Sequence, residues 1–103
     1  MSFEDQRHDV GEGWQPLIQK LHEDLTALDP AYTVEQIKEK FGGLRYYIGF
    51  SEDRDEETTR QMDALIWAAE EQSVKTCETC GEPGSVRNYR YWLTAACDEH
   101  ARK

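Results

Sequence analysis

The spacing of three cysteines and one histidine near the C-terminus constrains the fold more than any other feature of this chain. The segment reads Cys77-Glu-Thr-Cys80 and, after 16 further residues, Cys97-Asp-Glu-His100. Two residues within each pair let one tight turn present two ligands, and the intervening loop brings the pairs together, as in closed tetrahedral zinc sites. Gly81, directly after the second cysteine, has the backbone freedom that such a turn needs. The pattern predicts one structural Zn2+ ion per chain with four protein ligands.

Two other uses of these residues fit the sequence less well. A disulfide framework would leave one of the three cysteines unpaired, and the N-terminus lacks the basic and apolar parts of a secretion signal. A zinc deaminase needs a glutamate two residues after its first ligand, an offset that Glu99 has from Cys97. However, the order of the motifs is inverted here, and His100 would occupy the position of the catalytic water. We therefore expect a structural zinc in a protein of a reducing, cytoplasmic compartment.

Length and composition explain why such a chain would depend on a metal. The 103 residues, of which 38% are hydrophobic, make about one domain. A domain of this size buries only roughly 60–65% of its unfolded surface, and cores this small often rely on a metal or a partner. The longest apolar run, residues 64–69, is far shorter than the roughly 20 residues of a membrane span. We expect one α+β domain with a flexible leader at 1–13, an acidic body at 14–76 and a zinc-binding module at 77–103 packed on the body.

The net charge of −9 lies in the N-terminal three quarters of the chain. Residues 1–76 carry 17 acidic and 8 basic side chains, whereas residues 77–103 carry 4 of each. A protein that coats duplex nucleic acid needs cations at its phosphate contacts, so this balance argues against that class. It suits a protein that meets a basic surface, and it also serves solubility.

Two segments have the apolar spacing of amphipathic helices. The first follows a three–four repeat through Trp14, Leu17, Ile18, Leu21, Leu25 and Leu28, and Asp29-Pro30 would end it. The second begins near Asp53 and Glu56 and ends near Ser73. Its apolar face consists of Met62, Leu65, Ile66 and Ala69.

The segment from Tyr32 to Phe50 allows two interpretations. Thr33 can begin a short helix that Gly42 closes, or Gly42-Gly43 can be the two-residue turn of a β-hairpin. The hairpin register would pair Phe41 with Leu44, Glu39 with Tyr46 and Ile37 with Ile48. We favour the hairpin, because a single register then sorts the side chains of two segments onto two faces at once. Residues 44–50 are expected to form a strand in either case.

Three groups of residues are candidates for binding a partner. Trp67 points away from the apolar face of the second helix, beside Ala64, so either the zinc module covers it or it anchors a partner protein or a second copy of the chain. A second group is a basic patch on one face of the hairpin, formed by Lys38, Lys40, Arg45 and Tyr47. It can bind an anionic ligand or an acidic protein surface. Alternatively, its cations pair with nearby acids such as Glu35 and Glu39.

The third group is the basic and aromatic segment between the cysteine pairs. Its members can stack on bases and contact phosphates of single-stranded nucleic acid or a nucleotide: Arg87, Tyr89, Arg90 and Trp92. The alternative is structural: Val86, Tyr91 and Trp92 would cover the zinc site while Arg87 and Arg90 face water.

The chain is poor in catalytic groups. His22 lies beside the apolar face of the first helix with no nucleophile next to it, so we expect it at the edge of the core. No phosphate-binding glycine loop is present, because Gly42-Gly43 lacks the lysine and hydroxyl residue that such a loop requires. No enzyme class is indicated.

Several unusual segments in order resemble a family of small phage, prophage and bacterial proteins. They are Gly13-Trp14 before a leucine-rich helix, then Gln-Ile-Lys-Glu-Lys-Phe-Gly-Gly-Leu-Arg-Tyr-Tyr at 36–47, then Cys77-x2-Cys-Gly and Cys97-Asp-x-His100. The resemblance spans about residues 13–101. It implies a cytoplasmic setting in a bacterial or phage-infected cell, agrees with the zinc ligands and transfers no catalytic residue.

The sequence thus predicts a zinc-stabilised acidic protein that acts by binding rather than catalysis. Our leading hypothesis is a phage- or prophage-type accessory protein that binds and inhibits a host protein, for example in anti-phage defence. The alternative is a nucleic-acid- or nucleotide-binding zinc-finger module. No membrane association is expected.

Overall fold

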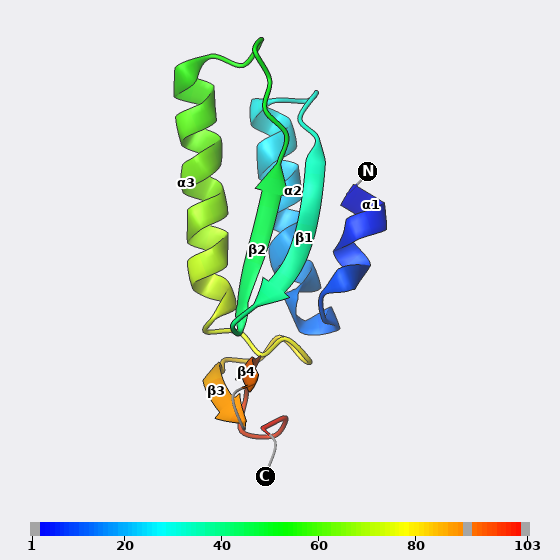
Figure 1. Ribbon diagram of the computed structural model, residues 1–103, viewed down its shortest axis with the longest axis vertical. Coiled ribbons are helices and arrows are strands. Elements are labelled where there is room, and N and C mark those ends of the chain that lie inside the picture. Colours follow the sequence, from blue (N-terminus) through cyan, green and yellow to red (C-terminus); the bar gives the residue numbers. More distant parts are fainter. Residues whose placement is uncertain (1–2, 90–91, 102–103) are drawn as a thin grey trace.

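The computed structural model describes residues 3–89 and 92–101, with only the backbone described at Tyr89, and shows an elongated α+β molecule (Figure 1). Its extents are 49 × 24 × 22 Å. The elements follow in the order α1 (Phe3–Gln6), η1 (Arg7–Asp9), η2 (Glu12–Trp14), α2 (Gln15–Leu28), β1 (Val34–Lys40), β2 (Gly43–Ile48), α3 (Glu56–Ser73), β3 (Ser85–Tyr89) and β4 (Trp92–Ala96). The expected fold class is confirmed.

Both predicted helices are present and begin and end close to the expected residues. Pro16 lies in the first turn of α2, and Asp29 adopts an extended conformation that ends the helix. At α3, the carboxylate of Asp55 accepts a hydrogen bond from the backbone N–H of Thr58, which satisfies a free donor of the first turn. Asp29 also binds the largely buried guanidinium of Arg54 at 2.9 Å and so ties the end of α2 to the loop before α3.

Residues 34–48 form a β-hairpin, so the helical interpretation of 33–41 is wrong. The turn is Phe41-Gly42 rather than Gly42-Gly43, because Lys40 pairs with Gly43 and Glu39 with Leu44. Phe41 and Gly42 have φ angles of 56° and 85°, as the favoured two-residue hairpin turn requires. Glu39 stabilises this turn by accepting the N–H of Gly42 at 2.6 Å.

The strand side chains remain on their predicted faces of the hairpin despite this change of register. Ile37 now pairs with Tyr46 instead of Ile48, a shift of two residues, and the side-chain period of a strand is also two. Ile37, Leu44 and Tyr46 are buried as expected. Phe41, by contrast, moves from the core face into the turn and is exposed.

The hairpin packs on the two long helices, and α3 also completes the free edge of β2. The largest fully buried apolar side chains are Trp14, Ile18, Leu25, Ile37, Leu44 and Met62. The outward N–H groups of Leu44 and Tyr46 donate to the Ser73 hydroxyl at 2.9 Å and the Glu70 carboxylate at 3.0 Å. Side chains of α3 therefore take the place of a third strand along this edge.

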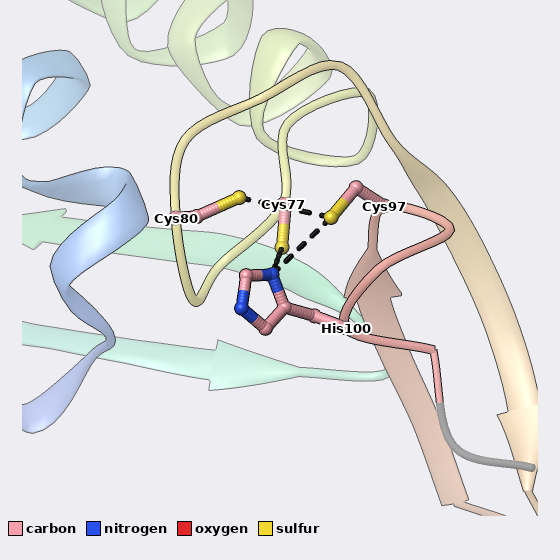
Figure 2. Close-up of side chains that lie close together, drawn as sticks. All are labelled: Cys77, Cys80, Cys97 and His100. Atoms are coloured by element: carbon pink, nitrogen blue, oxygen red, sulfur yellow. Dashed lines mark hydrogen bonds between the residues drawn. The ribbon is translucent and has the colours of Figure 1, made fainter.

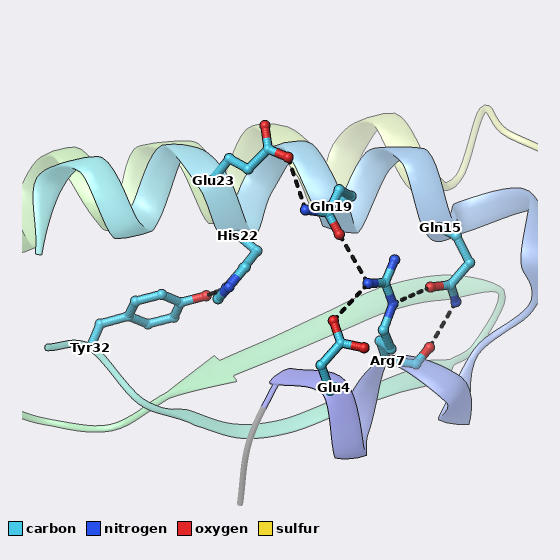
Figure 3. A network of polar contacts seen from close by, with 7 residues as sticks. All are labelled: Glu4, Arg7, Gln15, Gln19, His22, Glu23 and Tyr32. Carbon is cyan, nitrogen blue, oxygen red and sulfur yellow. Dashed lines mark hydrogen bonds and ion pairs between the residues drawn. The ribbon is translucent and has the colours of Figure 1, made fainter. Parts of the chain in front are cut away.

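The expected flexible leader at 1–13 is not what the structure shows for residues 3–13, which fold into short helical turns packed on the body. Phe3 and Val10 are buried members of the core, and Phe3 stacks on His22 with ring centroids 3.9 Å apart. Figure 3 shows Arg7 bridging from this segment to α2, where its guanidinium donates to Gln15 and Gln19. Composition alone suggested a mobile leader because residues 4–9 are all polar. The two apolar residues at either end, Phe3 and Val10, hold the segment to the body.

No helix in the described part of the chain is long and apolar enough to cross a membrane.

Candidate metal centre

The four predicted ligands converge at one end of the molecule. Figure 2 shows the side chains of Cys77, Cys80, Cys97 and His100 pointing toward one another. Their ligand atoms all lie within 4.8 Å of one another. Cys80 Sγ lies 3.7 Å from Cys97 Sγ, and His100 Nδ1 lies 3.7 Å from Cys77 Sγ and 3.2 Å from Cys97 Sγ. With zinc–sulfur bonds of about 2.3 Å and zinc–nitrogen bonds of about 2.0 Å, tetrahedral ligands lie roughly 3.5–3.8 Å apart. The group can therefore hold one metal ion.

Two tight turns present the ligands, as the spacing predicted. In the first, the N–H of Gly81 donates to the carbonyl of Cys77 at 2.8 Å, and Gly81 has a φ of 86°. The N–H of Cys77 in turn donates to Glu82 O at 2.8 Å. In the second, the N–H of His100 donates to Cys97 O at 3.2 Å.

The electrostatics of the site favour thiolate at Cys77. Burial opposes ionisation, but backbone N–H groups of Cys97, Cys80 and Thr79 donate toward the sulfur, and the pKa of Cys77 falls to about 6. The hydrogen bond between His100 and the Cys97 sulfur raises the pKa of the imidazole. The donor set of three sulfur atoms and one imidazole nitrogen matches the ligand preferences of zinc.

The N-terminal segment is the platform on which the first turn of the metal centre rests. The N–H of Gly13 donates to Glu78 O at 2.7 Å, and the indole N–H of Trp14 donates to Thr76 O at 3.0 Å. Gly13 approaches so closely that a Cβ on it would lie 2.1 Å from the carbonyl oxygen of Cys77. The Glu78 carboxylate reaches back to the N–H of Gly11 at 3.0 Å.

The second hairpin joins the metal centre to the core and to the first hairpin. β3 and β4 pair from Ser85–Ala96 to Tyr89–Trp92, and the carbonyl of Ala95 accepts the N–H of Glu78 at 3.0 Å. A Cβ on Gly42 would lie 2.8 Å from a methyl group of Val86, so the turn of one hairpin abuts the other. The sequence did not identify the contacts of the module with Gly11, Gly13 and Gly42 of the body. The glycines at 11, 13 and 42 were the available signal, since each permits a close backbone approach.

Trp67 is not covered by the zinc module, contrary to one of the two expectations for it. The module lies beyond the end of α3 (Figure 1), and 65% of Trp67 is exposed. Ala64, one turn earlier, is also exposed and lines an open hollow of about 600 Å³ between α2 and α3 with Leu28, Leu65 and their neighbours.

The predicted basic patch does share one face of the first hairpin. Lys38 and Arg45 are directly paired across the strands, and Lys40 and Tyr47 follow at alternate positions. The expected ion pairs to Glu35 and Glu39 do not form: in the described part of the chain no carboxylate lies within ion-pair distance of Lys38, Lys40 or Arg45. Instead, Lys38 Nζ lies 5.8 Å from the ring centre of Tyr47, and Lys40 Nζ lies 5.5 Å from that of Phe41.

The basic and aromatic segment of the second hairpin divides into different roles. Arg87 donates to Ala96 O at 3.1 Å and pairs with Asp98 at 2.7 Å, so it braces β4 and the second ligand turn rather than facing water alone. Trp92 is 63% exposed and does not cover the cluster. Arg90 and Tyr91, like the side chain of Tyr89, lie outside the described residues.

His22 lies at the edge of the core, as expected. Its ring stacks on that of Phe3, and its Nδ1 shares a hydrogen bond with the hydroxyl of Tyr32 (Figure 3). The Tyr32 hydroxyl contacts the Tyr46 hydroxyl at 2.9 Å. Burial lowers the pKa of His22 and raises that of Tyr46, so both groups are neutral near pH 7.

Comparison of the chain with models of protein families, with curated proteins and with solved structures finds no match. In the described residues, the fold and the site by themselves define an α+β domain with two long helices, α2 and α3, and two antiparallel hairpins, with a Cys3His group beside the second hairpin.

Proposed function

We propose that the Cys3His group binds one structural zinc ion. Four protein ligands leave no open coordination position, so the ion would hold the chain rather than activate water. The chain's own residues prepare the site: N–H groups around Cys77 stabilise its thiolate, and residues 11–14 fix the first ligand turn. Because the thiols must stay reduced to bind metal, the proposal places the protein in a reducing, cytoplasmic compartment.

Native mass spectrometry of the protein purified under reducing conditions tests this step. We expect one zinc per chain, released together with protons on acidification. A folded chain that carries no metal and is indifferent to chelator would contradict it.

We further propose that the protein acts by binding a protein partner through the outer face of α3. The observation that carries this proposal is Trp67, whose large apolar side chain is 65% exposed in the middle of a helix. Exposed tryptophans in such positions are typical anchors of interfaces. Ala64 and the hollow beside it give the partner an apolar surface next to the anchor.

The charges around Trp67 favour a basic partner surface. α3 carries five acidic residues and one basic residue, Arg60, which is already paired with Glu57. Asp63 and Glu71 flank Trp67 at helical spacing on either side. An acidic rim around an apolar anchor steers a basic surface toward it and repels acidic ones.

The finer part of the proposal concerns the identity of the partner. We propose a host protein of a phage-infected bacterium, whose activity the bound chain inhibits. The resemblance at residues 13–101 to small phage and prophage proteins supports this setting, together with the absence of any evident catalytic group in the sequence.

Pull-down from bacterial lysate with the zinc-loaded full chain as bait tests the binding proposal. Trp67→Ala should remove the specific partner, and raising the salt concentration should elute it. Phe50→Ala is the matched control, because Phe50 is an 89% exposed aromatic residue outside α3. A partner that both variants retain, or none in any lysate, would contradict the proposal. Self-association that only Trp67→Ala abolishes would replace the host protein with a second copy of the chain.

A further inference from the structure

We propose that a second surface of the molecule, formed where its two hairpins meet, binds single-stranded nucleic acid. This hairpin surface consists of Lys38, Lys40, Phe41, Arg45, Tyr47 and Trp92. It goes beyond the proposed binding of a protein at α3, because it uses different elements and attracts the opposite charge. It also differs from the binding segment expected from the sequence, since Arg87 is engaged with Asp98.

The hairpin surface exposes three aromatic rings. Phe41 is 68% exposed, Trp92 63% and Tyr47 43%. Phe41 and Trp92 come from different hairpins and line one open hollow of about 300 Å³, whose other walls are Glu39, Lys40 and Leu93. A hollow walled by aromatic rings accepts a flat, apolar group, and unpaired bases are flat groups that stack on such rings in any sequence.

The cations of this surface are available to an outside anion. Arg7, Lys20, Arg54, Arg60 and Arg87 each pair with a carboxylate, whereas Lys38, Lys40 and Arg45 have no such partner in the described part of the chain. The ammonium groups of Lys38 and Lys40 lie over the rings of Tyr47 and Phe41 instead, and the Arg45 guanidinium donates one hydrogen bond to the carbonyl of Leu44 at 3.2 Å. A cation held over a ring keeps its N–H donors free for phosphate oxygens.

The outer edge of β2 is not available to an added peptide strand. A peptide that extends a sheet needs free N–H and C=O groups at an edge, but the outward N–H groups of Leu44 and Tyr46 on β2 already donate to α3. What the hairpin offers here is a face of side chains, in which rings and cations alternate. That arrangement is typical of sheets that bind single strands.

The acidic remainder of the molecule restricts the ligand to a short single strand. With a net charge of −9, the protein repels a long duplex, and a duplex keeps its bases stacked and unavailable to the rings. At physiological salt, charges more than about 8 Å from the bound phosphates are largely screened. Within the hollow, the Glu39 carboxylate is occupied by the N–H of Gly42.

Fluorescence anisotropy with a labelled oligo-dT or oligo-U strand and the zinc-loaded full chain tests the proposal. We expect binding that weakens as salt rises, with little binding of a duplex of the same length. Phe41→Ala and Trp92→Ala should each weaken binding by about tenfold through lost stacking. The double variant Lys38→Ala/Lys40→Ala should lower the slope of log affinity against log salt by about 1.4.

Matched controls separate this surface from general charge and from α3. Lys75→Ala removes an exposed lysine elsewhere, and Trp67→Ala removes an exposed tryptophan; both should bind the strand as the parent does. Trp67→Ala also keeps the two proposals distinguishable, because it should abolish only the protein partner. Circular dichroism and zinc content verify that each variant is folded.

Three outcomes would overturn the proposal. The first is no binding of either strand at low salt. The second is competition by polyglutamate as strong as that by oligo-dT, with no effect of the ring variants, which would indicate an acidic protein as the ligand. The third is loss of binding in Lys75→Ala equal to that in the Lys38/Lys40 variant.

Discussion

The body and the zinc module are stabilised in different ways. The body buries large apolar side chains such as Trp14, Leu25 and Met62 between two helices and a hairpin. In the module, the buried apolar residues are small: Cys77, Ala95, Ala96 and Cys97. A two-stranded hairpin with so little apolar surface is at best marginally stable alone. From this difference we expect the module to depend on metal ligation and on its contacts with residues 11–14, and the body to stay folded without metal.

Loss of the metal should have the largest effect and should separate the two regions. Structural zinc contributes on the order of 10–16 kcal/mol in small zinc-binding peptides. We therefore expect Cys97→Ala, or a strong chelator, to remove hydrogen-exchange protection from β3 and β4 while α2 and α3 keep theirs. Glu99→Ala, an exposed change in the same turn, is the control. Equal loss of protection in α2 and β4 would show that the metal holds both regions.

Trp14 belongs to both regions, and its removal should have the next largest effect. Its side chain is fully buried in the body, and its indole N–H donates to Thr76 just before the module. Truncation of a buried tryptophan typically costs about 3–5 kcal/mol. Trp14→Ala should therefore lower the free energy of unfolding by that amount in urea titrations. Trp14→Phe should recover most of the packing and lose about 1 kcal/mol for the missing hydrogen bond.

If Trp14 served the body alone, neither variant would change the affinity for zinc. We expect both to weaken it, because Thr76 adjoins the ligand Cys77. Competition with a chromogenic chelator measures this, and an unchanged zinc affinity would contradict the shared role.

Gly13→Ala should act mainly on the module. Its added Cβ would lie 2.1 Å from Cys77 O and 2.5 Å from the backbone nitrogen of Gly81. These are backbone atoms that cannot yield without moving the ligand turn, and overpacking of this kind costs about 1–3 kcal/mol. The expected result is weaker zinc binding in the same chelator assay, with β1 and β2 still protected from exchange.

Gly49→Ala is the matched glycine control for this prediction. Its Cβ would meet side-chain atoms of Thr33 and Glu35 in the body, far along the chain from the ligands. It should leave zinc affinity unchanged. Equal weakening of zinc binding by both variants would show that the effect of Gly13→Ala is not local.

The comparison also shows which parts of the structure the sequence could predict. The ligand set and both long helices follow from local spacing, because ligand turns and helical periodicity involve residues close together in the chain. The faces of the first hairpin were predicted for the same reason. Its turn was not, because Phe41 adopts a positive φ, which is unfavourable for a residue other than glycine. The turn also lies against the distant module, where a Cβ on Gly42 would come within 2.8 Å of Val86.

The contacts between regions were the part that the sequence could not supply. Residues 1–13 read as a leader because their composition is polar, yet Phe3 and Val10 reach the core and Gly13 supports Cys77. Each of these contacts joins segments remote in the chain and leaves no periodic signal. The sequence also failed to show that the lysines of the first hairpin have no carboxylate partner, because Glu35 and Glu39 lie close to them in the chain. Successive side chains of a strand point to opposite faces, which keeps a lysine away from the glutamate next to it.

Residues 3–10 attach to the body in a way that should respond to pH, with the smallest of the expected effects. Phe3 stacks on His22, whose other neighbours are the Tyr32 hydroxyl and the charged groups of Glu4, Arg7 and Glu23. Burial lowers the pKa of His22 below its ordinary 6.5, and the charge of Arg7 adds to this effect against the opposing carboxylates. The folded protein therefore binds this proton less readily than the unfolded chain.

It follows that stability contributed by neutral His22 is complete above about pH 6.5 and declines as the pH falls from there toward the lowered pKa of the folded state. His22→Gln, which cannot titrate, should have a smaller loss of stability between pH 7 and pH 5 in urea titrations. His8→Gln, at an exposed histidine of η1, should follow the parent protein. Metal release and carboxylate titration affect all three proteins alike. The difference between the pH profiles of the parent and His22→Gln therefore reports the effect of His22 alone. Identical pH profiles for the parent and His22→Gln would show that protonation of His22 does not affect how the N-terminal segment is attached to the body.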